Sequence, residues 1–425
     1  MPKVFIKTLG CAMNTRDSEL LFAELRDKEG YEKASSAEES DLILINACSV
    51  RERPISKLFS ELGAFNLIKK PTAKIGVCGC TASHLGASIF RRAPYVDFVL
   101  GARNVSKITT ALKEPRSVYI DAANDDSEYV FADYRSNKYQ ALINISFGCD
   151  KRCAYCIVPY TRGKEVSVPF KIALNEVKRA ADNGAIEVVL LGQNVNSYLD
   201  DRGEKIDFPT LLEKVGEIDG IKRIRFQSPH PLHMDDRFLD VFANNPKVCK
   251  HMHMPLQSGS TRVLKAMKRG YTKEWFLQKA ERVRSLAPEA TISTDIIVGF
   301  PSESDKDFED TLDVMKIVKF ERLFSFKFSP RPMTLAAKME NRIDDKTASA
   351  RLNIAQSLYK KHLGEAMNAQ IGKTFEAFLE EADEGFFAKT NNFYALKVLE
   401  GKAGTFARVK ATRVDRGALQ GEIVG

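Results

Sequence analysis

Short apolar runs alternate with segments of helical periodicity along the first hundred residues of this chain. The run Val4–Leu9 precedes a helical pattern from Arg16 to Lys28, for which Asn14 or Thr15 can serve as the cap. Further strand-like runs are Asp41–Asn46, Lys74–Cys80 and Asp97–Gly101. Strands that alternate with helices predict a parallel sheet with helices on both faces. We therefore expect an N-terminal parallel α/β sheet domain over residues 1–115.

Three cysteines, Cys11, Cys48 and Cys80, each lie just past the end of one of these strands. Ligands bind at the carboxyl ends of the strands in such sheets, so we expect this trio to converge in space. The alternative is that they are small buried hydrophobic residues, as free cysteines often are. Cys78 is a rival ligand because strand alternation would give it a facing similar to that of Cys80. Its position inside the strand favours a structural role.

The same alternation returns after a polar segment at about residues 114–139, which is typical of a linker. The candidate strands are Ala141–Phe147, Glu187–Leu191, Arg223–Gln227, His251–Leu256, Thr291–Val298 and Arg322–Phe328. The candidate helices are Lys171–Asn183, Phe208–Ile218, Asp235–Asn244, Thr272–Ser285, Ser304–Lys319 and Asp344–Asn368. Six such units predict an incomplete (β/α)6 barrel over residues 135–368, with its chemistry at the carboxyl-terminal rim.

A second set of cysteines, the triplet Cys149, Cys153 and Cys156, lies in the loop after the first of these strands with the spacing C-x3-C-x2-C. Thiolates ligate soft metals and iron–sulfur clusters. A closed zinc site needs four protein ligands, and no fourth Cys or His lies nearby in the sequence. Three ligands on a four-iron cluster leave one iron open. The pattern favours that cluster over an incomplete zinc site or redox-inert thiols.

Other candidate rim loops are rich in Gly and small polar residues, where backbone can approach a ligand. They begin at Gly192, Ser228, Gln257 and Gly299. Loops between strands and helices need such residues for turning anyway, so each loop alone is weak evidence. His251 and His253 share one face of a predicted strand, and a packed or hydrogen-bonded role is favoured over metal binding. Cys249 stands alone and is interpreted as structural.

The last sixty residues change character, with short strands joined by Gly and polar turns. The runs are Gly372–Leu379, Phe386–Lys389, Tyr394–Leu399, Thr405–Val414 and Gly421–Val424. They predict a small C-terminal all-β barrel over residues 369–425, of the kind that holds RNA. Arg408, Lys410, Arg413 and Arg416 supply a basic edge for phosphates. The alternative is a solvated charged edge that prevents strand pairing.

The composition fits an intracellular protein with an anionic partner. A net charge of +8 over 425 residues suggests such a partner, most commonly nucleic acid. No apolar run approaches the roughly 18–20 residues of a membrane helix, and the chain starts directly with a strand rather than a signal pattern. We therefore expect a cytoplasmic protein, in which eight cysteines serve metal binding or catalysis rather than disulfides.

Five motifs join these regions into one pattern. They are Thr8–Glu19, Asn46–Glu52, Val158–Ser167, His253–Ser260 and Ser329–Pro332. With them, the chain resembles the methylthiotransferase branch of the radical S-adenosylmethionine enzymes over essentially its whole length. Within that branch it is most similar to the subgroup that makes 2-methylthio-N6-isopentenyladenosine beside the anticodon of tRNA. Ala47, Pro54 and Val168 depart from the usual residues, and none of the three departures removes a ligand.

The resemblance implies two [4Fe–4S] clusters and S-adenosyl-L-methionine. The triplet would hold a cluster whose open iron chelates S-adenosylmethionine, and the trio would hold a second cluster that carries the sulfur. One electron would release a 5′-deoxyadenosyl radical, which removes the hydrogen from carbon 2 of the adenine before methylthio is attached. Tyr155 would pack near the cofactor adenine. The candidates for further cofactor contacts are Gly192, Gln193, Ser228, Gln257 and Gly299.

The resemblance also implies tRNA as a partner, an electron donor such as flavodoxin or ferredoxin, no membrane and a monomer. Arg408, Lys410 and Arg413 would contact the RNA. One alternative is the same chemistry on N6-threonylcarbamoyladenosine in tRNA or on an aspartate of a ribosomal protein. A more distant alternative is a non-catalytic iron–sulfur or zinc protein that binds RNA.

Overall fold

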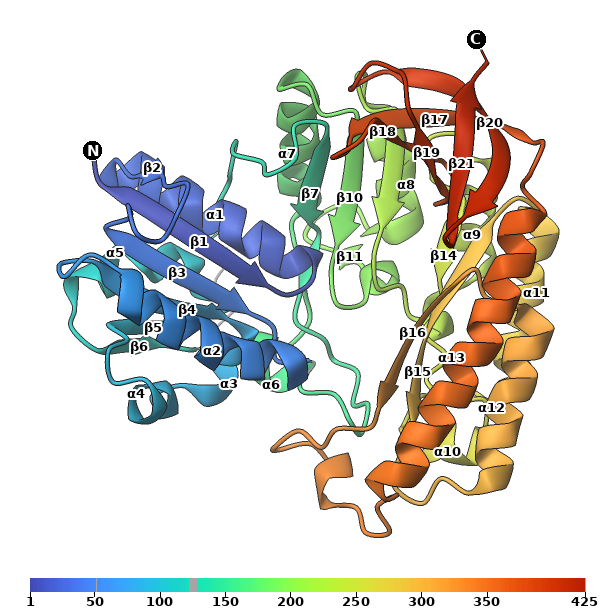
Figure 1. Cartoon of the computed structure of the whole chain (residues 1–425), viewed down its shortest axis with the longest axis horizontal. Helices are drawn as coiled ribbons and strands as arrows, with labels where there is room; N and C mark the ends of the chain where they lie inside the picture. The colour runs from blue at the N-terminus through green and yellow to red at the C-terminus, as the bar shows by residue number, and fades with distance from the viewer. Residues whose placement is uncertain (51, 122–128, 425) are drawn as a thin grey trace. The chain divides into compact units, whose positions relative to one another are not determined.

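The computed structural model describes residues 1–50, 52–121 and 129–424. They form two compact units (Figure 1). Unit 1 comprises Met1–Asp207, Ile218–Ile221 and Ser329–Ala337, and unit 2 comprises Phe208–Glu217, Lys222–Phe328 and Lys338–Gly425. Arg51 of the motif Asn46–Glu52 and residues 122–128 of the expected linker lie outside the described residues.

The N-terminal region is a parallel sheet in the order β2-β1-β3-β4-β5-β6, as predicted. The strands are β1 (Lys3–Leu9), β2 (Glu32–Lys33), β3 (Leu42–Ala47), β4 (Lys74–Gly79), β5 (Phe98–Gly101) and β6 (Ser117–Tyr119). The two edge strands β2 and β6 were not expected. They are two and three residues long, too short for an alternating pattern to be recognised in the sequence.

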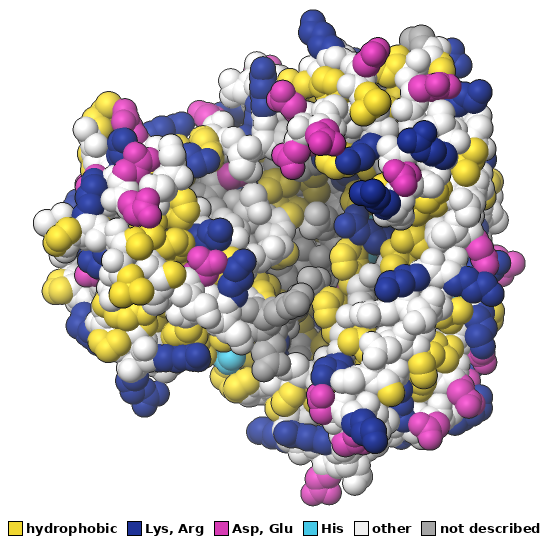
Figure 2. Space-filling model, in the orientation of Figure 1, with side chains coloured by type: hydrophobic (Ala, Val, Ile, Leu, Met, Phe, Trp, Pro, Cys, Tyr) yellow, Lys and Arg dark blue, Asp and Glu magenta, His cyan; other side chains and the backbone are white. Residues whose placement is uncertain are grey.

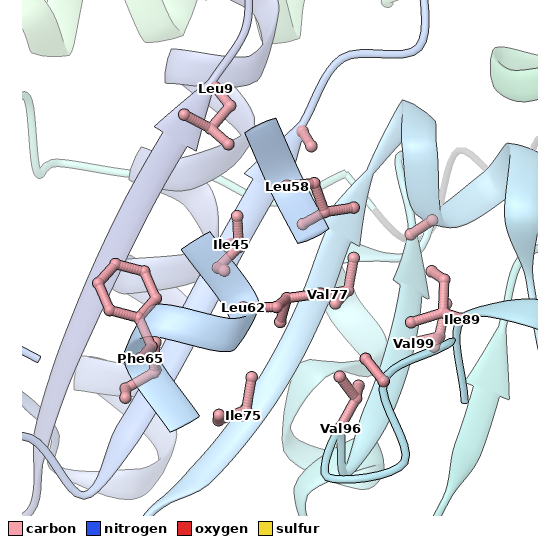
Figure 3. Close-up of a cluster of buried hydrophobic side chains, with 14 of the residues drawn as sticks. Leu9, Ile45, Leu58, Leu62, Phe65, Ile75, Val77, Ile89, Val96 and Val99 are labelled. Carbon is pink, nitrogen blue, oxygen red and sulfur yellow. The ribbon is translucent and has the colours of Figure 1, made fainter. Parts of the chain in front are cut away.

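Helices cover both faces of this sheet because its strands alternate their apolar residues between the two faces. On one face, Ile45 and Val77 pack against α2 (Glu52–Ile68) and α4 (Ser88–Arg92), and Figure 3 shows Leu58 and Leu62 of α2 among these side chains. The opposite face packs against α1 (Ala12–Glu29) and α5 (Ile108–Lys113). The sheet is thus buried on both faces.

The first helix begins earlier than its hydrophobic pattern indicated. Cys11, rather than Asn14 or Thr15, is the N-cap of α1, and Asn14 at the third helical position accepts a hydrogen bond from the Cys11 backbone N–H at 3.3 Å. The polar first turn concealed this start. Gly30 ends the helix with φ of 67°, in the left-handed conformation that glycine adopts readily.

The six central strands predicted from the sequence are all present and make the partial barrel. They are β7 (Gln140–Asn144), β10 (Glu187–Leu191), β13 (Arg223–Phe226), β14 (His251–His253), β15 (Thr291–Val298) and β16 (Arg322–Lys327). In unit 1, β7 pairs in parallel with β10. In unit 2, β14, β15 and β16 form a parallel sheet. Strand β14 ends at His253, three residues before the predicted end.

The helices of the central region also match their predicted positions to within two residues. They are α7 (Phe170–Asp182), α8 (Phe208–Gly216), α9 (Asp236–Asn244), α11 (Lys273–Leu286), α12 (Asp305–Val318) and α13 (Asp345–Asn368). In Figure 1, α13 lies alongside α12 and against β16. The helix that the sequence predicts from about Thr81 is present as α3 (Cys80–Leu85). Short elements that the sequence patterns did not indicate are α6 (Val158–Arg162), α10 (Thr261–Ala266), β8 (Ser146–Phe147), β9 (Val166–Ser167), β11 (Leu199–Asp200) and β12 (Ile206–Asp207).

The C-terminal region is a closed five-stranded barrel in the order β17-β18-β19-β21-β20, as predicted. Its strands are β17 (Thr374–Glu381), β18 (Phe386–Thr390), β19 (Ala395–Val398), β20 (Phe406–Asp415) and β21 (Ala418–Ile423). Leu379, Leu396 and Val409 fill its core. Closure leaves no unpaired sheet edge. Within the described parts of the chain, no helix combines the length and the hydropathy needed to cross a membrane.

Candidate functional site

The N-terminal trio lies where three adjacent strands of one sheet end. Cys11 follows β1 and Cys48 follows β3, while Cys80 follows β4 and is the first residue of α3. Gly79 makes the turn into Cys80 with φ of 88°, and a Cβ there would lie 2.1 Å from the side-chain oxygen of Asn46. Glycine is therefore required immediately before this cysteine.

The three thiols interact with one another, as the sequence predicted from their equivalent positions. A hydrogen bond from the Cys48 thiol, helped by the charge of Arg162, lowers the pKa of Cys11 to about 6. The pKa of Cys48 is raised by the same hydrogen bond and by burial, and Cys80 adds to it electrostatically. Cys11 is therefore the thiolate of the group at neutral pH, and the position of Cys11 at the N-terminus of α1 also favours a negative charge.

A network of amides holds the trio in place. The Asn14 amide donates to Asn46 Oδ1 at 3.0 Å, and the Asn46 amide donates to the Asn14 carbonyl oxygen at 2.9 Å. The Cys48 backbone N–H donates to the Leu9 carbonyl oxygen at 2.9 Å. Both asparagines are fully buried, so these bonds are not in competition with water. They tie the start of α1 to the end of β3.

Arg162 reaches the trio from the segment that follows the cysteine triplet. Its Nε donates to Cys80 Sγ at 3.1 Å, and its Nη2 donates to Asp17 Oδ2 at 2.6 Å. The guanidinium is fully buried, which opposes its charge, yet Asp17 and Cys80 raise the pKa of Arg162 well above its usual value. It is a permanent cation inside the site. The helices α3 and α6 that carry Cys80 and Arg162 lie side by side (Figure 1).

The chemistry of this donor set fits a sulfur-rich anionic group. Buried Ser49 Oγ and Thr81 Oγ1, each next to a cysteine of the trio, make no hydrogen bond to a described residue, nor does Arg162 Nη1. Nowhere in residues 1–50, 52–121 or 129–424 do three His, Cys, Asp or Glu side chains already surround a common metal position. Cys11 and Cys48 hydrogen bond to each other instead, and Cys80 accepts from Arg162.

The remaining two cysteines lie apart from the trio's interactions. Cys78 is buried in the face of the sheet that packs against α1 and α5, where burial raises its pKa. The expectation that Cys78 and Cys80 face the same way was wrong because the chain turns at Gly79 and Cys80 belongs to α3 rather than to the strand. Cys249 is buried in unit 2.

The cysteine triplet lies in a loop without regular structure between β8 and α6. The loop is closed at its base because β8 pairs with β9. The Cys149 backbone N–H donates to the Gly163 carbonyl oxygen at 3.1 Å, and that of Cys156 donates to the Cys153 carbonyl oxygen at 3.1 Å. Burial raises the pKa of Cys149 to about 11. All three thiols are half-buried, so they are accessible to an incoming ligand.

The segment Ser329–Ala337 contacts both cysteine loops. Arg331 donates through Nη2 to the Val50 carbonyl oxygen at 3.2 Å, two residues after Cys48. The Ala336 backbone N–H donates to the Ala154 carbonyl oxygen at 2.8 Å, inside the triplet loop. The motif Ser329–Pro332 thus belongs to the same compact unit as both sets of cysteines, although it is distant from them in sequence.

Unpartnered polar groups gather after β7 and β10, near the predicted cofactor residues of unit 1. The Asn144 and Asn194 side chains and Ser146 Oγ are buried with polar atoms that bond to no described residue, which fits a polar ligand. A Cβ on Gly192 would lie 2.3 Å from Ser146 Oγ, so the backbone approaches closely there. Gln193 contacts the Met13 sulfur of α1, and Tyr155 is half-buried in the triplet loop.

The other three predicted cofactor residues lie in unit 2, and all three have left-handed backbone conformations. Ser228 follows β13 with φ of 58°, Gln257 follows β14 with φ of 71°, and Gly299 follows β15 with φ of 71°. Such strain in non-glycine residues is uncommon and collects at functional sites. Ser228 is exposed, whereas Gln257 and Gly299 are buried.

The two predicted histidines hydrogen bond along one face of the sheet in unit 2, as expected. His251 contacts Thr291 Oγ1 at 2.8 Å and Ser293 Oγ at 3.0 Å, while His253 contacts Ser293 Oγ at 2.8 Å and Asp295 Oδ2 at 3.1 Å.

The predicted RNA-contacting residues are all exposed on β20. Arg408 and Lys410 alternate with buried Val409 and therefore share the outer face of the barrel, and Arg413 lies beyond a β-bulge in the same strand. Figure 2 shows Lys and Arg side chains interspersed with Asp and Glu over the C-terminal barrel.

Sequence reasoning gave no role to Arg162, Asp17 or Arg331, although all three lie in motifs that it singled out. For Arg162, the sequence shows only an arginine six residues after the last cysteine of the triplet. Which thiol such a residue reaches depends on tertiary structure.

Two family models match the chain. The Radical SAM superfamily matches residues 143–315, and the Uncharacterized protein family UPF0004 matches residues 3–101. The first match contains the triplet, and the second contains the trio.

Relatives match the chain over its full length. Proteins described as tRNA-2-methylthio-N(6)-dimethylallyladenosine synthase are 58% identical in Campylobacter curvus, with 99% of each chain covered, and 56% identical in Nitratiruptor, with 100% of this chain and 99% of that one covered. The protein of that description from Sulfurimonas denitrificans is 54% identical, with the same coverage as in Nitratiruptor.

Solved structures share the fold at low sequence identity. The radical S-adenosylmethionine methyltransferase TsrM from Kitasatospora setae matches with a TM-score of 0.57 and 14% identity, covering 79% of this chain and 77% of that one. The cobalamin-dependent radical enzyme OxsB matches with a TM-score of 0.51 and 14% identity, covering 85% of this chain and 56% of that one.

Proposed function

The chain belongs to the tRNA-2-methylthio-N6-dimethylallyladenosine synthase family, and we propose on that basis the reaction that it catalyses and the residues that carry it out. It is a radical S-adenosylmethionine tRNA methylthiotransferase. Its substrate is the N6-isopentenyladenosine beside the anticodon, which receives sulfur and a methyl group at carbon 2.

The observation that supports this assignment most strongly is that the trio and the triplet belong to one compact unit. One set of three thiols is consistent with radical chemistry on many substrates. Two sets that each lack a fourth ligand provide one site that binds a cofactor and another that donates sulfur.

We assign a [4Fe–4S] cluster and S-adenosylmethionine to the triplet, and a second [4Fe–4S] cluster to the trio. When bound, these groups supply one-electron reduction, a carbon radical, a methyl group and the sulfur to be transferred. The half-buried triplet thiols leave room for a cofactor. Cys11, whose pKa is lowered by the Cys48 hydrogen bond, is favoured as a thiolate, the form in which cysteine ligates iron.

The other polar groups of unit 1 orient the cofactor in this proposal. Asn144, Ser146 and Asn194 offer buried donors and acceptors, and Gly192 permits close approach of the backbone. Tyr155 and Gln193 are assigned to the cofactor surroundings as well. Ser228, Gln257 and Gly299, which belong to unit 2, remain candidate cofactor contacts on the strength of the family resemblance alone.

The three regions then have separate tasks. Residues 1–115 carry the sulfur-donating site, residues 135–368 carry the cofactor site, and residues 369–425 bind tRNA through Arg408, Lys410 and Arg413. An enzyme that modifies tRNA operates in the cytoplasm, as a monomer in our assignment, and needs an external one-electron donor such as flavodoxin or ferredoxin.

Iron content and tRNA nucleoside analysis together test this proposal. The reconstituted wild-type protein is expected to hold about eight irons per monomer. A Cys11→Ala, Cys48→Ala, Cys80→Ala variant is expected to hold about four, to keep producing 5′-deoxyadenosine under dithionite, and to form no methylthio product. A Cys249→Ala variant is the matched control and should behave as wild type.

The outcome that contradicts the ligand assignment is a trio variant that still holds about eight irons. Mass spectrometry of tRNA nucleosides from a deletion strain tests the substrate. Accumulation of unmodified N6-isopentenyladenosine is expected, whereas loss of a methylthio group from N6-threonylcarbamoyladenosine instead would reassign the substrate.

A further inference from the structure

Arg162 is a buried cation with more hydrogen-bonding capacity than its protein neighbours use. Its side chain is 1% exposed, its Nη2 bonds Asp17, and its Nε bonds Cys80. Its Nη1 is buried and bonds to no described residue. Leaving such a donor unsatisfied costs free energy, so this arrangement favours an acceptor that arrives with a ligand.

Two further groups, each on the residue that follows a cysteine of the trio, share this property. Ser49 Oγ and Thr81 Oγ1 are buried next to Cys48 and Cys80, and neither has a partner in the described part of the chain. The three unsatisfied groups are therefore two hydroxyls and one guanidinium NH2, all of which can donate.

The neighbouring charges favour a negative ligand. Asp17 pairs with the guanidinium through Nη2 only, at 2.6 Å, and leaves the Nη1 side unpaired. Sulfur anions are large, polarizable acceptors that form hydrogen bonds with N–H groups, and such bonds stabilise the more negative state of an iron–sulfur site.

We propose that Arg162 is a positioning residue of the trio site, which donates to Cys80 Sγ through Nε and binds an anionic sulfur ligand through Nη1. Ser49 and Thr81 donate to the same ligand. This inference rests on the proposed function, because the trio must carry a cluster for the sulfur to be delivered there.

The position of Arg162 in the chain adds a second consequence. The helix α6, which ends at Arg162, begins two residues after Cys156. Arg162 therefore connects the loop of the triplet to a thiol of the trio. A well-ordered triplet loop helps to hold the Arg162 side chain against Cys80.

The test uses full-length protein in which Cys149→Ala, Cys153→Ala and Cys156→Ala leave only the trio cluster. Arg162→Gln in this background is expected to lower the midpoint potential of the cluster in an EPR-monitored redox titration. It is also expected to weaken the binding of sodium sulfide about tenfold, since a charge-assisted hydrogen bond is lost.

Asp17→Asn is the matched control, because it breaks the same ion pair but keeps the guanidinium. It is expected to raise the potential and to leave sulfide binding intact. If Arg162 served only to pair with Asp17, both substitutions would alter iron retention to the same extent, and neither would change the affinity for sulfide. That result would overturn the proposal.

Arg162→Lys covers the case in which the Gln variant does not fold. Lysine keeps the charge and can still pair with Asp17, but it lacks the fork that reaches two acceptors at once. Weaker sulfide binding at an unchanged melting temperature is expected, and wild-type binding would overturn the proposal. A triplet variant that holds no iron would instead contradict the cluster assignment itself, and this inference with it.

Discussion

At the scale of single residues, buried charges join segments that are far apart in the sequence. Arg16 on α1 pairs with Glu19 on the same helix and with Glu176 on α7, and all three side chains are at most 5% exposed. The Tyr129 hydroxyl donates to Glu176. Breaking a buried pair leaves a charge without compensation, which costs far more than the loss of an exposed pair.

We expect Arg16→Leu to lower the free energy of unfolding by about 3–5 kcal/mol, because Glu19 and Glu176 would be left buried and unpaired. Urea denaturation followed by circular dichroism measures this. The control is Lys57→Leu, which removes the exposed pair with Glu61 and should change stability by less than about 1 kcal/mol. Equal effects of the two substitutions would contradict the buried network.

The six cysteines proposed as ligands and the buried arginines differ in how readily the sequence singles them out. The cysteines were predicted because their spacing, or their place after a strand, is a local property. Arg16 and Arg162 resemble surface residues in the sequence. Only the tertiary structure places them among carboxylates and thiols.

At the scale of elements, the loop after β18 attaches the C-terminal barrel to the central strands of unit 2. The Asn392 carbonyl oxygen accepts from Thr291 Oγ1 at 2.6 Å, and the Thr390 carbonyl oxygen accepts from Arg225 at 3.0 Å. The Phe393 ring stacks on His251 with centroids 4.4 Å apart. Phe393 has φ of 74°, a strained conformation that these contacts hold in place.

This contact makes stability depend on pH through His251. Burial, with His253, Arg225 and Arg322 adding to it, lowers the pKa of His251 from 6.5 to about 3. The unfolded chain therefore binds this proton first as the pH falls. Neutral His251 costs no stability above pH 6.5, and the free energy of unfolding falls progressively as the pH drops from 6.5 to 3. The loss is about 2 kcal/mol at pH 5.

Comparing wild type with His251→Gln isolates this term, because the other titrating groups are common to both proteins. The difference in unfolding free energy between the two proteins should shrink by about 2 kcal/mol from pH 8 to pH 5. A difference that stays constant with pH would contradict a neutral, buried His251.

Strand positions were predicted well because apolar alternation and the turns around it are local. The errors occur where a tertiary contact decides the boundary. Helix α1 starts at Ala12 with Cys11 as its N-cap, where the Cys11 backbone N–H donates to Asn14 Oδ1, and β14 stops at His253. The short strands β2 and β6 pair with the edges of a sheet that the other strands form. Their own few residues therefore do not show the pattern of a strand.

At the scale of the whole molecule, the order of sheet, partial barrel and closed barrel follows directly from the sequence, but the division into two compact units does not. The division passes through the central repeats, with β7 and β10 in unit 1 and the later strands in unit 2. The strands before that boundary and the strands after it have similar apolar sequence patterns. Long-range packing decides where it falls.

Binding of tRNA belongs to this scale, because it depends on total charge as well as on its position. We expect Arg408→Glu, Lys410→Glu, Arg413→Glu to weaken binding and to reduce the slope of log K against log salt by about 2–3, since about three phosphate contacts are lost. Fluorescence anisotropy with labelled tRNA at several salt concentrations measures both quantities.

A variant with the same change in net charge is the control. Lys28→Glu, Lys113→Glu, Lys316→Glu reverses three exposed lysines outside the C-terminal barrel. It should change the slope much less. Equal slopes for the two variants would mean that overall charge, and not β20, determines the affinity.

The segment Ser329–Ala337 has a consequence for taking the protein apart. It belongs to unit 1, while the chain immediately before and after it belongs to unit 2. No single cut can therefore release either unit intact. A gene fragment that stops at Asp207 would encode both sets of cysteines but would lack the bonds that Arg331 and Ala336 make to the loops beside them. A fragment cut at a linear boundary would keep all six cysteines that we propose as iron ligands, but it would lose the hydrogen bonds that hold their loops.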